Sequence, residues 1–471
     1  MGAITVVALL LRVAAIDSAL FGDELFTWAG ARRNSLGEVL DFVRTSGDEL
    51  NPPLFPLLAW LTGKLGDPTV TLRLPSLLAG TVTVPLVYAL GARTVDRPTA
   101  LVGAVLFAIS PFAVFYGSEA RAYALLACLV TLSSVALLKA LDSDSRRWWA
   151  VFAAASLGAL LTHYTAVLVL AGQALWAFWA HPECRRRLLL AHAAVVAGYL
   201  VWLPSQLEQR REVGGEGVIE ALEPLTLGSI ARAILKLIPG HPFVPLREIP
   251  GRPALALFLA CVAVAGAAAV LTRRPRLELS RPVLLLIVLA LATPVGALLY
   301  SIASTSIFLP RNLIASVPAA CLCVGAVLTR PRGSLRLVLV SLALAAVAFG
   351  TVRSLDDDFE RPPYGRVAEF LERQARPSDA VLEVETAIDE PSLALEAEFD
   401  PPPPLRRTRP GQTAVPADVL RADRVLLVLP RFGPPPQALR PDPLTRRFRR
   451  ADARVYTGLV PVAVETYVRR R

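Results

Sequence analysis

The chain has 471 residues, of which 54% are hydrophobic and 19% are charged, and its mean hydropathy is +0.50. Soluble domains carry about a quarter charged residues, so this composition excludes an ordinary soluble protein. The net charge of +10 lies mostly in short loops between apolar runs, which argues against nucleic acid as a partner and is typical of the loops that set membrane topology.

Long apolar runs recur up to about residue 350. They predict eleven membrane-spanning helices, at residues 3–20, 73–92, 98–115, 121–141, 148–162, 164–180, 188–205, 253–271, 282–302, 311–329 and 335–353. With a cytoplasmic N-terminus, all five basic loops fall on the inside. These loops are residues 93–97, 139–147, 185–187, 273–281 and 330–336. We therefore expect an all-α polytopic membrane domain over residues 1–353.

The apolar run 54–65 is too short to cross about 30 Å of hydrocarbon. We interpret it as an interfacial helix on the outer surface, because counting it as a span would place the basic loops outside. Three segments then face outward: a first outer loop at 17–72, a second at 206–251, and the tail at 354–471.

The tail is polar and rich in proline. Its pattern predicts an amphipathic helix at 367–374 and strands at 380–384, 424–429 and 455–468. Proline-rich loops are expected between them, at 401–404 and 434–436. A small extracytoplasmic α/β domain is the expected fold, and it contains no catalytic pattern.

Two carboxylates, Asp23 and Glu24, follow the first span. One interpretation is a solvated interfacial pair. The other makes Asp23 a general base that takes a proton from an acceptor hydroxyl, while Glu24 orients it. Ionisable groups at the mouth of a helical bundle favour the second interpretation, because they are costly to keep there without a function.

Further polar residues stand at the outer ends of later spans. Glu119 and Arg121 begin the fourth span, with Tyr123 beyond them. They either form a local salt bridge, or Arg121 binds phosphate through its guanidinium fork while Glu119 positions substrate or a cation.

His163 and Tyr164 occupy an outer turn between spans. A lone histidine there is more often an interfacial hydrogen-bonding residue than a ligand, although it lies on the same predicted side as Asp23. Arg73 and Arg311, at the outer starts of two other spans, are either headgroup anchors or binding residues for a lipid phosphate.

Arg12 falls inside the first apolar run, where a charge is costly. It either extends outward to the same site or indicates a start upstream, and both readings stay open. The chain has no P-loop, dinucleotide fingerprint or nucleophile elbow. Its five cysteines show no metal-ligand spacing.

Several phrases occur in a characteristic order: Phe21-Gly22-Asp23-Glu24, Asn51-Pro52-Pro53-Leu54-Phe55, Arg73-Leu74-Pro75-Ser76, Ser110-Pro111 followed by Tyr116-Gly117-Ser118-Glu119-Ala120-Arg121-Ala122-Tyr123, and Thr162-His163-Tyr164. Together they resemble the bacterial branch of the protein O-mannosyltransferase-like superfamily of GT-C membrane glycosyltransferases, which includes the lipid A aminoarabinose transferases. Gly117 stands where relatives often have another small or polar residue, and we give this difference little weight.

The resemblance implies a hexosyl- or pentosyltransferase that uses a polyprenyl-phosphate-linked sugar and inverts the anomeric carbon at the outer face. The acceptor is then a glycan, lipid or protein of the cell envelope. The family pattern places its essential acidic residue at Asp23. Glu119, Arg121 and His163 match motif positions whose roles differ among subfamilies. Some relatives use a divalent cation, so metal dependence stays open.

Two other functions compete with transfer. A transporter or flippase of a lipid-linked glycan would favour internal repeats and charges in mid-membrane, whereas the ionisable residues here cluster at the ends of spans. A non-catalytic scaffold that presents the tail would leave that cluster unexplained.

Overall fold

The computed structural model describes residues 1–16, 18–46, 49–212, 224–271, 280–376, 378–384, 394–399, 405–408, 415–431 and 442–470. The contacts divide the chain into two compact units. Unit 1 comprises Met1–Ile16, Asn34–Thr62 and Arg73–Ser354, and unit 2 comprises Asp17–Arg33, Gly63–Leu72 and Leu355–Arg471. Unit 1 ends at Ser354, and two parts of the predicted first outer loop group with the tail.

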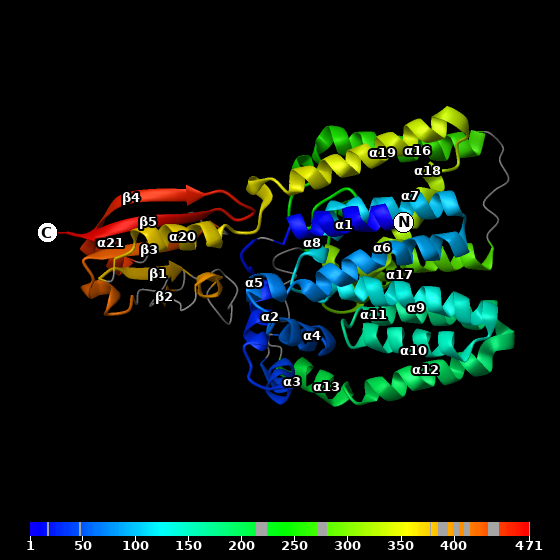
Figure 1. Ribbon diagram of the computed structural model, residues 1–471, viewed down its shortest axis with the longest axis horizontal. Coiled ribbons are helices and arrows are strands. Elements are labelled where there is room, and N and C mark those ends of the chain that lie inside the picture. The colour runs from blue at the N-terminus through cyan, green and yellow to red at the C-terminus, as the bar shows by residue number, and fades with distance from the viewer. Residues whose placement is uncertain are drawn as a thin grey trace. The chain divides into compact units, whose positions relative to one another are not determined.

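Unit 1 is helical (Figure 1). Its helices are α1 (Gly2–Ala14), α3 (Leu36–Thr45), α4 (Leu54–Thr62), α6 (Leu74–Thr94), α7 (Arg97–Ile109), α8 (Pro111–Gly117), α9 (Tyr123–Ser143), α10 (Arg146–Leu160), α11 (Ala166–Ala180), α12 (Arg185–Leu200), α13 (Leu203–Glu212), α15 (Leu227–Lys236), α16 (Arg252–Leu271), α17 (Arg281–Ala303), α18 (Val317–Leu328) and α19 (Gly333–Ser354), with short turns η1 (Pro182–Cys184), η2 (Arg247–Gly251) and η3 (Pro310–Ser316). Each predicted span overlaps a helix, so the polytopic helical fold is confirmed.

The helices differ in whether they are long enough to cross a membrane. Among the described residues, six are long and apolar enough, and eight if each bent pair counts as one span. The bent pairs are α7 with α8, at 60°, and α12 with α13, at 53°. The apolar helices α1 and α11 are shorter, and α4 is a nine-residue helix at the place of the predicted interfacial helix.

The bend between α7 and α8 corrects the prediction of one straight span at 98–115. Pro111 has no N–H to donate, so it begins a new helix at its first position. Ser110 caps that helix by accepting from the N–H of Ala113, and its hydroxyl donates to the carbonyl of Ile238 at 2.8 Å. The span therefore breaks where the motif Ser110-Pro111 stands.

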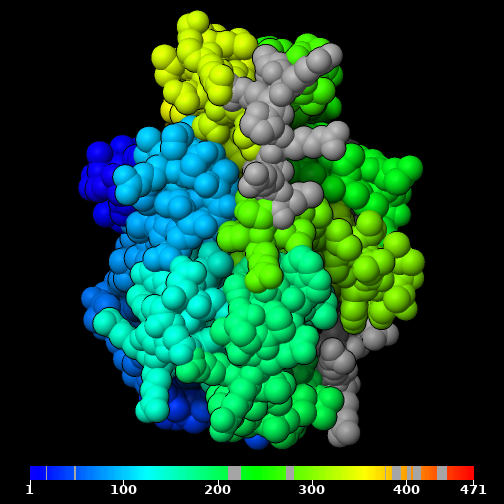
Figure 2. Space-filling view, turned by 90° about the vertical axis from the view of Figure 1, so that its right-hand side faces the viewer, coloured from blue at the N-terminus to red at the C-terminus, as the bar shows by residue number. Residues whose placement is uncertain are grey.

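The predicted basic loops gather at one end of unit 1. Arg93 pairs with Asp142 at 2.9 Å, and Arg187 pairs with Asp144. Thr99 and Thr329 share a hydrogen bond of 3.0 Å, which joins the start of α7 to the end of α18. Figure 2 views this end, where the light-blue, cyan and green segments lie side by side. The loop at 273–281 lies almost wholly outside the described residues. Loops on one side of a membrane must gather at one end of the helical domain, as these basic loops do.

Arg12 does not extend outward, which corrects one of the two readings left open for it. Its side chain is buried inside unit 1, and its guanidinium donates to the carbonyls of Ala8, Ala108 and Ala113 at 2.9–3.4 Å. A Cβ on Gly117 would lie 2.4 Å from Arg12 Nε. The glycine at 117 is therefore required by the buried arginine, so the little weight given to it was wrong.

Unit 2 is an α/β unit built largely from the tail. Its elements are α2 (Asp23–Ala31), α5 (Pro68–Thr71), η4 (Asp357–Phe359), α20 (Tyr364–Gln374), β1 (Ala380–Val384), η5 (Ala394–Glu398), β2 (Leu405–Thr408), η6 (Val419–Arg421), β3 (Arg424–Pro430), α21 (Asp442–Arg447), β4 (Phe448–Tyr456) and β5 (Val462–Arg469). The strands form one sheet in the order β2-β1-β3-β5-β4. The three at β2, β1 and β3 are parallel, and β5 and β4 are antiparallel to their neighbours.

The predicted tail elements recur with one correction. The helix at 367–374 and the strands at 380–384 and 424–429 coincide with α20, β1 and β3. The single strand predicted at 455–468 is wrong, because the chain turns at Thr457–Pro461 and returns as a hairpin of β4 and β5. Gly458 and Pro461 are turn residues inside that run. The proline-rich loops at 401–404 and 434–436 lie outside the described residues.

Candidate active site

The motif Tyr116 to Tyr123 forms a tight connection between α8 and α9. Its backbone turns back on itself where the N–H of Arg121 donates to the carbonyl of Glu119 at 2.7 Å. Ser76, in the first turn of α6, donates to the carbonyl of Arg121 at 2.9 Å. The side chains of Glu119 and Arg121 are buried. The connection thus holds two charged residues inside the protein at the end of α9 opposite the basic loops, roughly 30 Å away along its 21 residues.

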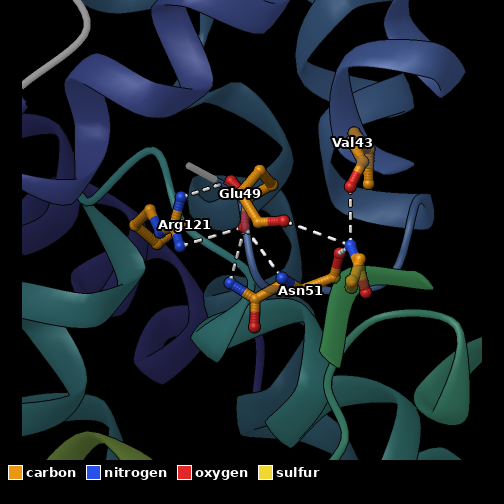
Figure 3. Close-up of polar contacts among 5 residues, drawn as sticks. Val43, Glu49, Asn51 and Arg121 are labelled. Atoms are coloured by element: carbon orange, nitrogen blue, oxygen red, sulfur yellow. Dashed lines mark hydrogen bonds and ion pairs between the residues drawn. The ribbon is translucent and has the colours of Figure 1, made fainter. Parts of the chain in front are cut away.

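Arg121 forms a buried ion pair with Glu49, a residue that the sequence analysis did not single out (Figure 3). Its two terminal nitrogens lie 2.5 and 3.2 Å from the Glu49 carboxylate oxygens. The exposed side-chain fractions are 6% for Arg121 and 2% for Glu49. The ion pair expected from the sequence was a local one with Glu119, whereas this one joins residues 72 positions apart.

Glu49 also closes its own loop. One carboxylate oxygen accepts from the backbone N–H of Asn51 at 3.1 Å and from its side-chain amide at 2.8 Å (Figure 3). A carboxylate with several donors is well satisfied even when buried. The pair with Arg121 therefore fixes the segment at residues 49–51 against the start of α9, and this segment leads into the Asn51-Pro52-Pro53 motif.

A second set of contacts holds the same loop from α13. Gln209 donates its amide N–H groups to the carbonyls of Val43, Glu49 and Asn51, at 2.6, 3.1 and 3.4 Å. Its carbonyl oxygen accepts from the hydroxyl of Tyr164. Tyr164, predicted to bind substrate, thus acts here as a support for the loop.

His163 lies close enough to two of the predicted arginines to feel their charge. The positive charges of Arg121 and Arg311 both act on its ring, and the ring centroid of Tyr123 is 5.6 Å away. The structure therefore brings together four of the predicted site residues in unit 1. Because the backbone N–H of Thr165 donates to Nδ1 of His163, the neutral ring carries its proton on Nε2. That nitrogen is a donor, which suits an anionic or carbonyl oxygen.

Burial first, and then the positive charges of Arg121 and Arg311, lower the pKa of His163 from its ordinary value of 6.5 to about 3. In the range between these values the unfolded chain binds the proton and the folded protein does not. The stability of the fold is therefore complete above pH 6.5 and falls as the pH decreases below it.

We predict that acidification below pH 6 costs the wild-type protein about 1.4 kcal/mol of unfolding free energy per pH unit through His163 alone. Thermal unfolding in detergent from pH 7.5 to pH 5 measures this effect, and the His163→Gln variant should have a flatter profile. His181, in a histidine–glutamate pair at the surface, provides the control: His181→Gln should keep the wild-type slope. Equal slopes for all three proteins would contradict the neutral state of His163.

Arg73 is fully buried, so it is not a headgroup anchor. Its guanidinium donates to the carbonyl of Ile16 at 2.7 Å, which holds the end of α1 to the start of α6. Arg311, in η3, is half-buried. Of the predicted arginines in unit 1, Arg311 is thus the one whose side chain is least enclosed by the protein.

The predicted catalytic carboxylates lie in unit 2, at the first turn of α2. Asp23 is half-buried, whereas the Glu24 side chain is fully buried and pairs with Arg361 at 3.3 Å. The two neighbours therefore point into different environments, as expected for adjacent carboxylates. Arg361 carried no signal in the sequence.

In the part of the chain that the structure describes, no group of three or more histidine, cysteine, aspartate or glutamate side chains is arranged to hold a metal ion.

The sequence and the fold both resemble known glycosyltransferases. Residues 50–205 match the family model described as dolichyl-phosphate-mannose-protein mannosyltransferase. Two crystal structures of ArnT from Cupriavidus metallidurans, in the apo state and bound to undecaprenyl phosphate, have TM-scores of 0.54 and 0.56 and identities of 15% and 16%, each over 98% of this chain and 97% of that chain. The arabinofuranosyltransferase AftD from Mycobacteria has a TM-score of 0.51 and 15% identity over 100% of this chain and 40% of that chain. No protein of curated function matches in sequence.

The family match and the shared fold confirm the resemblance to GT-C membrane glycosyltransferases that the ordered motifs predicted. At such identities the structures establish the fold. Within the class, the chain resembles ArnT and the dolichyl-phosphate-mannose-protein mannosyltransferases, as the sequence analysis expected.

Proposed function

We propose that this protein transfers a sugar from a polyprenyl-phosphate donor to a hydroxyl of a cell-envelope acceptor, at the outer face of the membrane and with inversion. The observation that carries the proposal is the likeness to ArnT over nearly the whole of both chains, because one of those structures is bound to undecaprenyl phosphate. The family match at residues 50–205, which contains Arg121 and His163, supports it.

The roles follow from the chemistry of a single displacement. The attacking hydroxyl must lose a proton, and in this proposal the half-buried Asp23, at the acidic position of the family pattern, is the base. The lipid phosphate leaves with negative charge, which needs fixed positive charge and hydrogen-bond donors. Arg311 and the Nε2–H of His163 supply these, and Arg121 adds its charge nearby. One carboxylate suffices, because inversion needs no covalent intermediate.

Unit 1 separates its charged groups in a way that suits a membrane-embedded enzyme. The basic loops meet at one end, and the group around Arg121 and His163 lies at the other, roughly 30 Å away along α9. This is about the thickness of hydrocarbon. With the basic end in the cytoplasm, the active site and the tail are extracytoplasmic.

The transporter alternative finds less support. The family model and the three structures compared above all belong to transferases. In the described residues, the ionisable side chains of the site lie at helix ends rather than in mid-membrane, where a transporter binds its substrate.

Reconstituted full-length protein tests the proposal directly. We expect it to move radiolabel from at least one member of a panel of polyprenyl-phosphate hexoses and pentoses to extracted envelope glycans, lipids or proteins, with release of polyprenyl phosphate. In vesicles that carry the same labelled donors, flipping is measured as a change in the accessibility of the donor to a membrane-impermeant reagent. Flipping without transfer would overturn the proposal in favour of the transporter.

A further inference from the structure

The tail contributes a side chain to the acidic segment of the first outer loop. Arg361, between α19 and α20, has an exposed side-chain fraction of 5%, and its partner Glu24 has 0%. The guanidinium lies 3.3 Å from the Glu24 carboxylate through Nε, and its Nη1 donates to the hydroxyl of Ser18 at 3.2 Å. All of these residues belong to unit 2. One arginine thus holds two points of the loop.

The Glu24 carboxylate also closes the turn that contains Asp23. It accepts from the backbone N–H of Phe21 at 3.3 Å. The backbone N–H of Glu24 donates in return to the carbonyl of Phe21 at 3.2 Å. Gly22 takes a positive φ of 56° inside this turn, a conformation that glycine adopts at little cost. The position of the Asp23 backbone is therefore set by the carboxylate that Arg361 binds.

Arg361 is itself held by the β4–β5 hairpin. The N–H of Leu459 donates to the carbonyl of Glu360 at 2.6 Å. A Cβ on Gly458 would lie 3.3 Å from the Arg361 carbonyl oxygen, so the hairpin turn packs directly on this backbone. A continuous set of contacts thus runs from the sheet of the tail through Arg361 and Glu24 to the turn at Asp23.

We propose that Arg361 is a positioning residue: it fixes the Phe21–Glu24 turn so that Asp23 can act, which makes the tail a required part of the catalytic unit. The catalytic part of this inference rests on the proposed function. A buried charge pair is suited to such a role. Without the guanidinium, the buried Glu24 carboxylate loses its counter-charge, and its exposure to water would open the turn.

The variant Arg361→Gln tests the proposal in two measurements on the full-length protein. In hydrogen–deuterium exchange, we expect the amides of Phe21 to Leu25 to exchange at least tenfold faster than in the wild type. In sugar transfer, we expect kcat per folded molecule to fall at least tenfold with the donor KM within twofold, since a misplaced base slows chemistry rather than donor binding. Arg361→Lys keeps the charge, and its kcat should be at least threefold higher than that of Arg361→Gln.

The matched control is Arg32→Gln. Arg32 pairs with Glu396 at 3.9 Å, and its side chain is 60% exposed, so it also joins the first loop to the tail but at the surface. We expect wild-type exchange and wild-type kcat from this variant. Unchanged exchange of Phe21 to Leu25 in Arg361→Gln, or an unchanged kcat, would overturn the inference. The exchange experiment contains no substrate, so failure of the proposed transfer reaction would be seen separately, in the wild-type assay.

Discussion

Replacing Asp23 with asparagine is expected to reduce sugar transfer by about 10²–10⁴-fold, the usual contribution of a general base. Asparagine has nearly the same shape as aspartate and does not accept the acceptor's proton. Asp23 is half-buried in the first turn of α2. Because the two side chains have nearly the same shape, the substitution should leave the fold and membrane insertion unchanged. The measurement is transfer of labelled sugar per folded molecule, at saturating donor and acceptor.

The control for this variant is Asp357→Asn, which removes an exposed carboxylate from the same unit. It should transfer sugar at the wild-type rate. If Asp23→Asn also keeps the wild-type rate, Asp23 is not the base. A fall in folded yield with normal transfer by the remaining protein would likewise assign Asp23 a structural role.

Local patterns predicted the elements of this protein well. Apolar length marked the predicted spans, and short apolar runs marked β1 and β3, because both signals depend on neighbouring residues alone. The prediction failed at residues 455–468, which are rich in residues that favour strands. The turn at Gly458 and Pro461 divides this run between β4 and β5.

Partners distant in sequence could not be predicted in the same way. The sequence shows that Arg121 needs a counter-ion, and its neighbour Glu119 was the obvious candidate, but the fold supplies Glu49 from the first loop. Glu49 stands two residues before the Asn51-Pro52-Pro53 motif, which was the one available hint. Arg12 and Gly117 form a similar case, since an absent side chain is explained only by the buried arginine that fills its place.

The first loop shows the same limit at the scale of domains. Residues 17–33 and 63–72 were expected with the membrane domain because they lie between its spans. Their contacts are instead with the tail, through Glu24 and Arg361 among others. Proximity in sequence assigned these residues to one unit, whereas their contacts in the fold group them with the other.

The variant Arg121→Met is expected to lose roughly 3–5 kcal/mol of stability, because it leaves the buried Glu49 carboxylate without its guanidinium partner. Methionine keeps the apolar stem, so the loss reports the charge. The double variant Glu49→Gln/Arg121→Met removes both charges and should recover most of that stability. Unfolding in detergent, followed as a double-mutant cycle, measures the coupling between the two residues.

The double variant also separates support of the loop from binding of phosphate. If Arg121 adds charge to the phosphate site beside His163 and Arg311, donor affinity stays at least tenfold weaker in the double variant although stability returns, and the acceptor KM remains within twofold of wild type. Full recovery of donor affinity would assign Arg121 to the loop alone. Equal losses for donor and acceptor would count against a phosphate role, since only the donor carries the anion that a guanidinium binds.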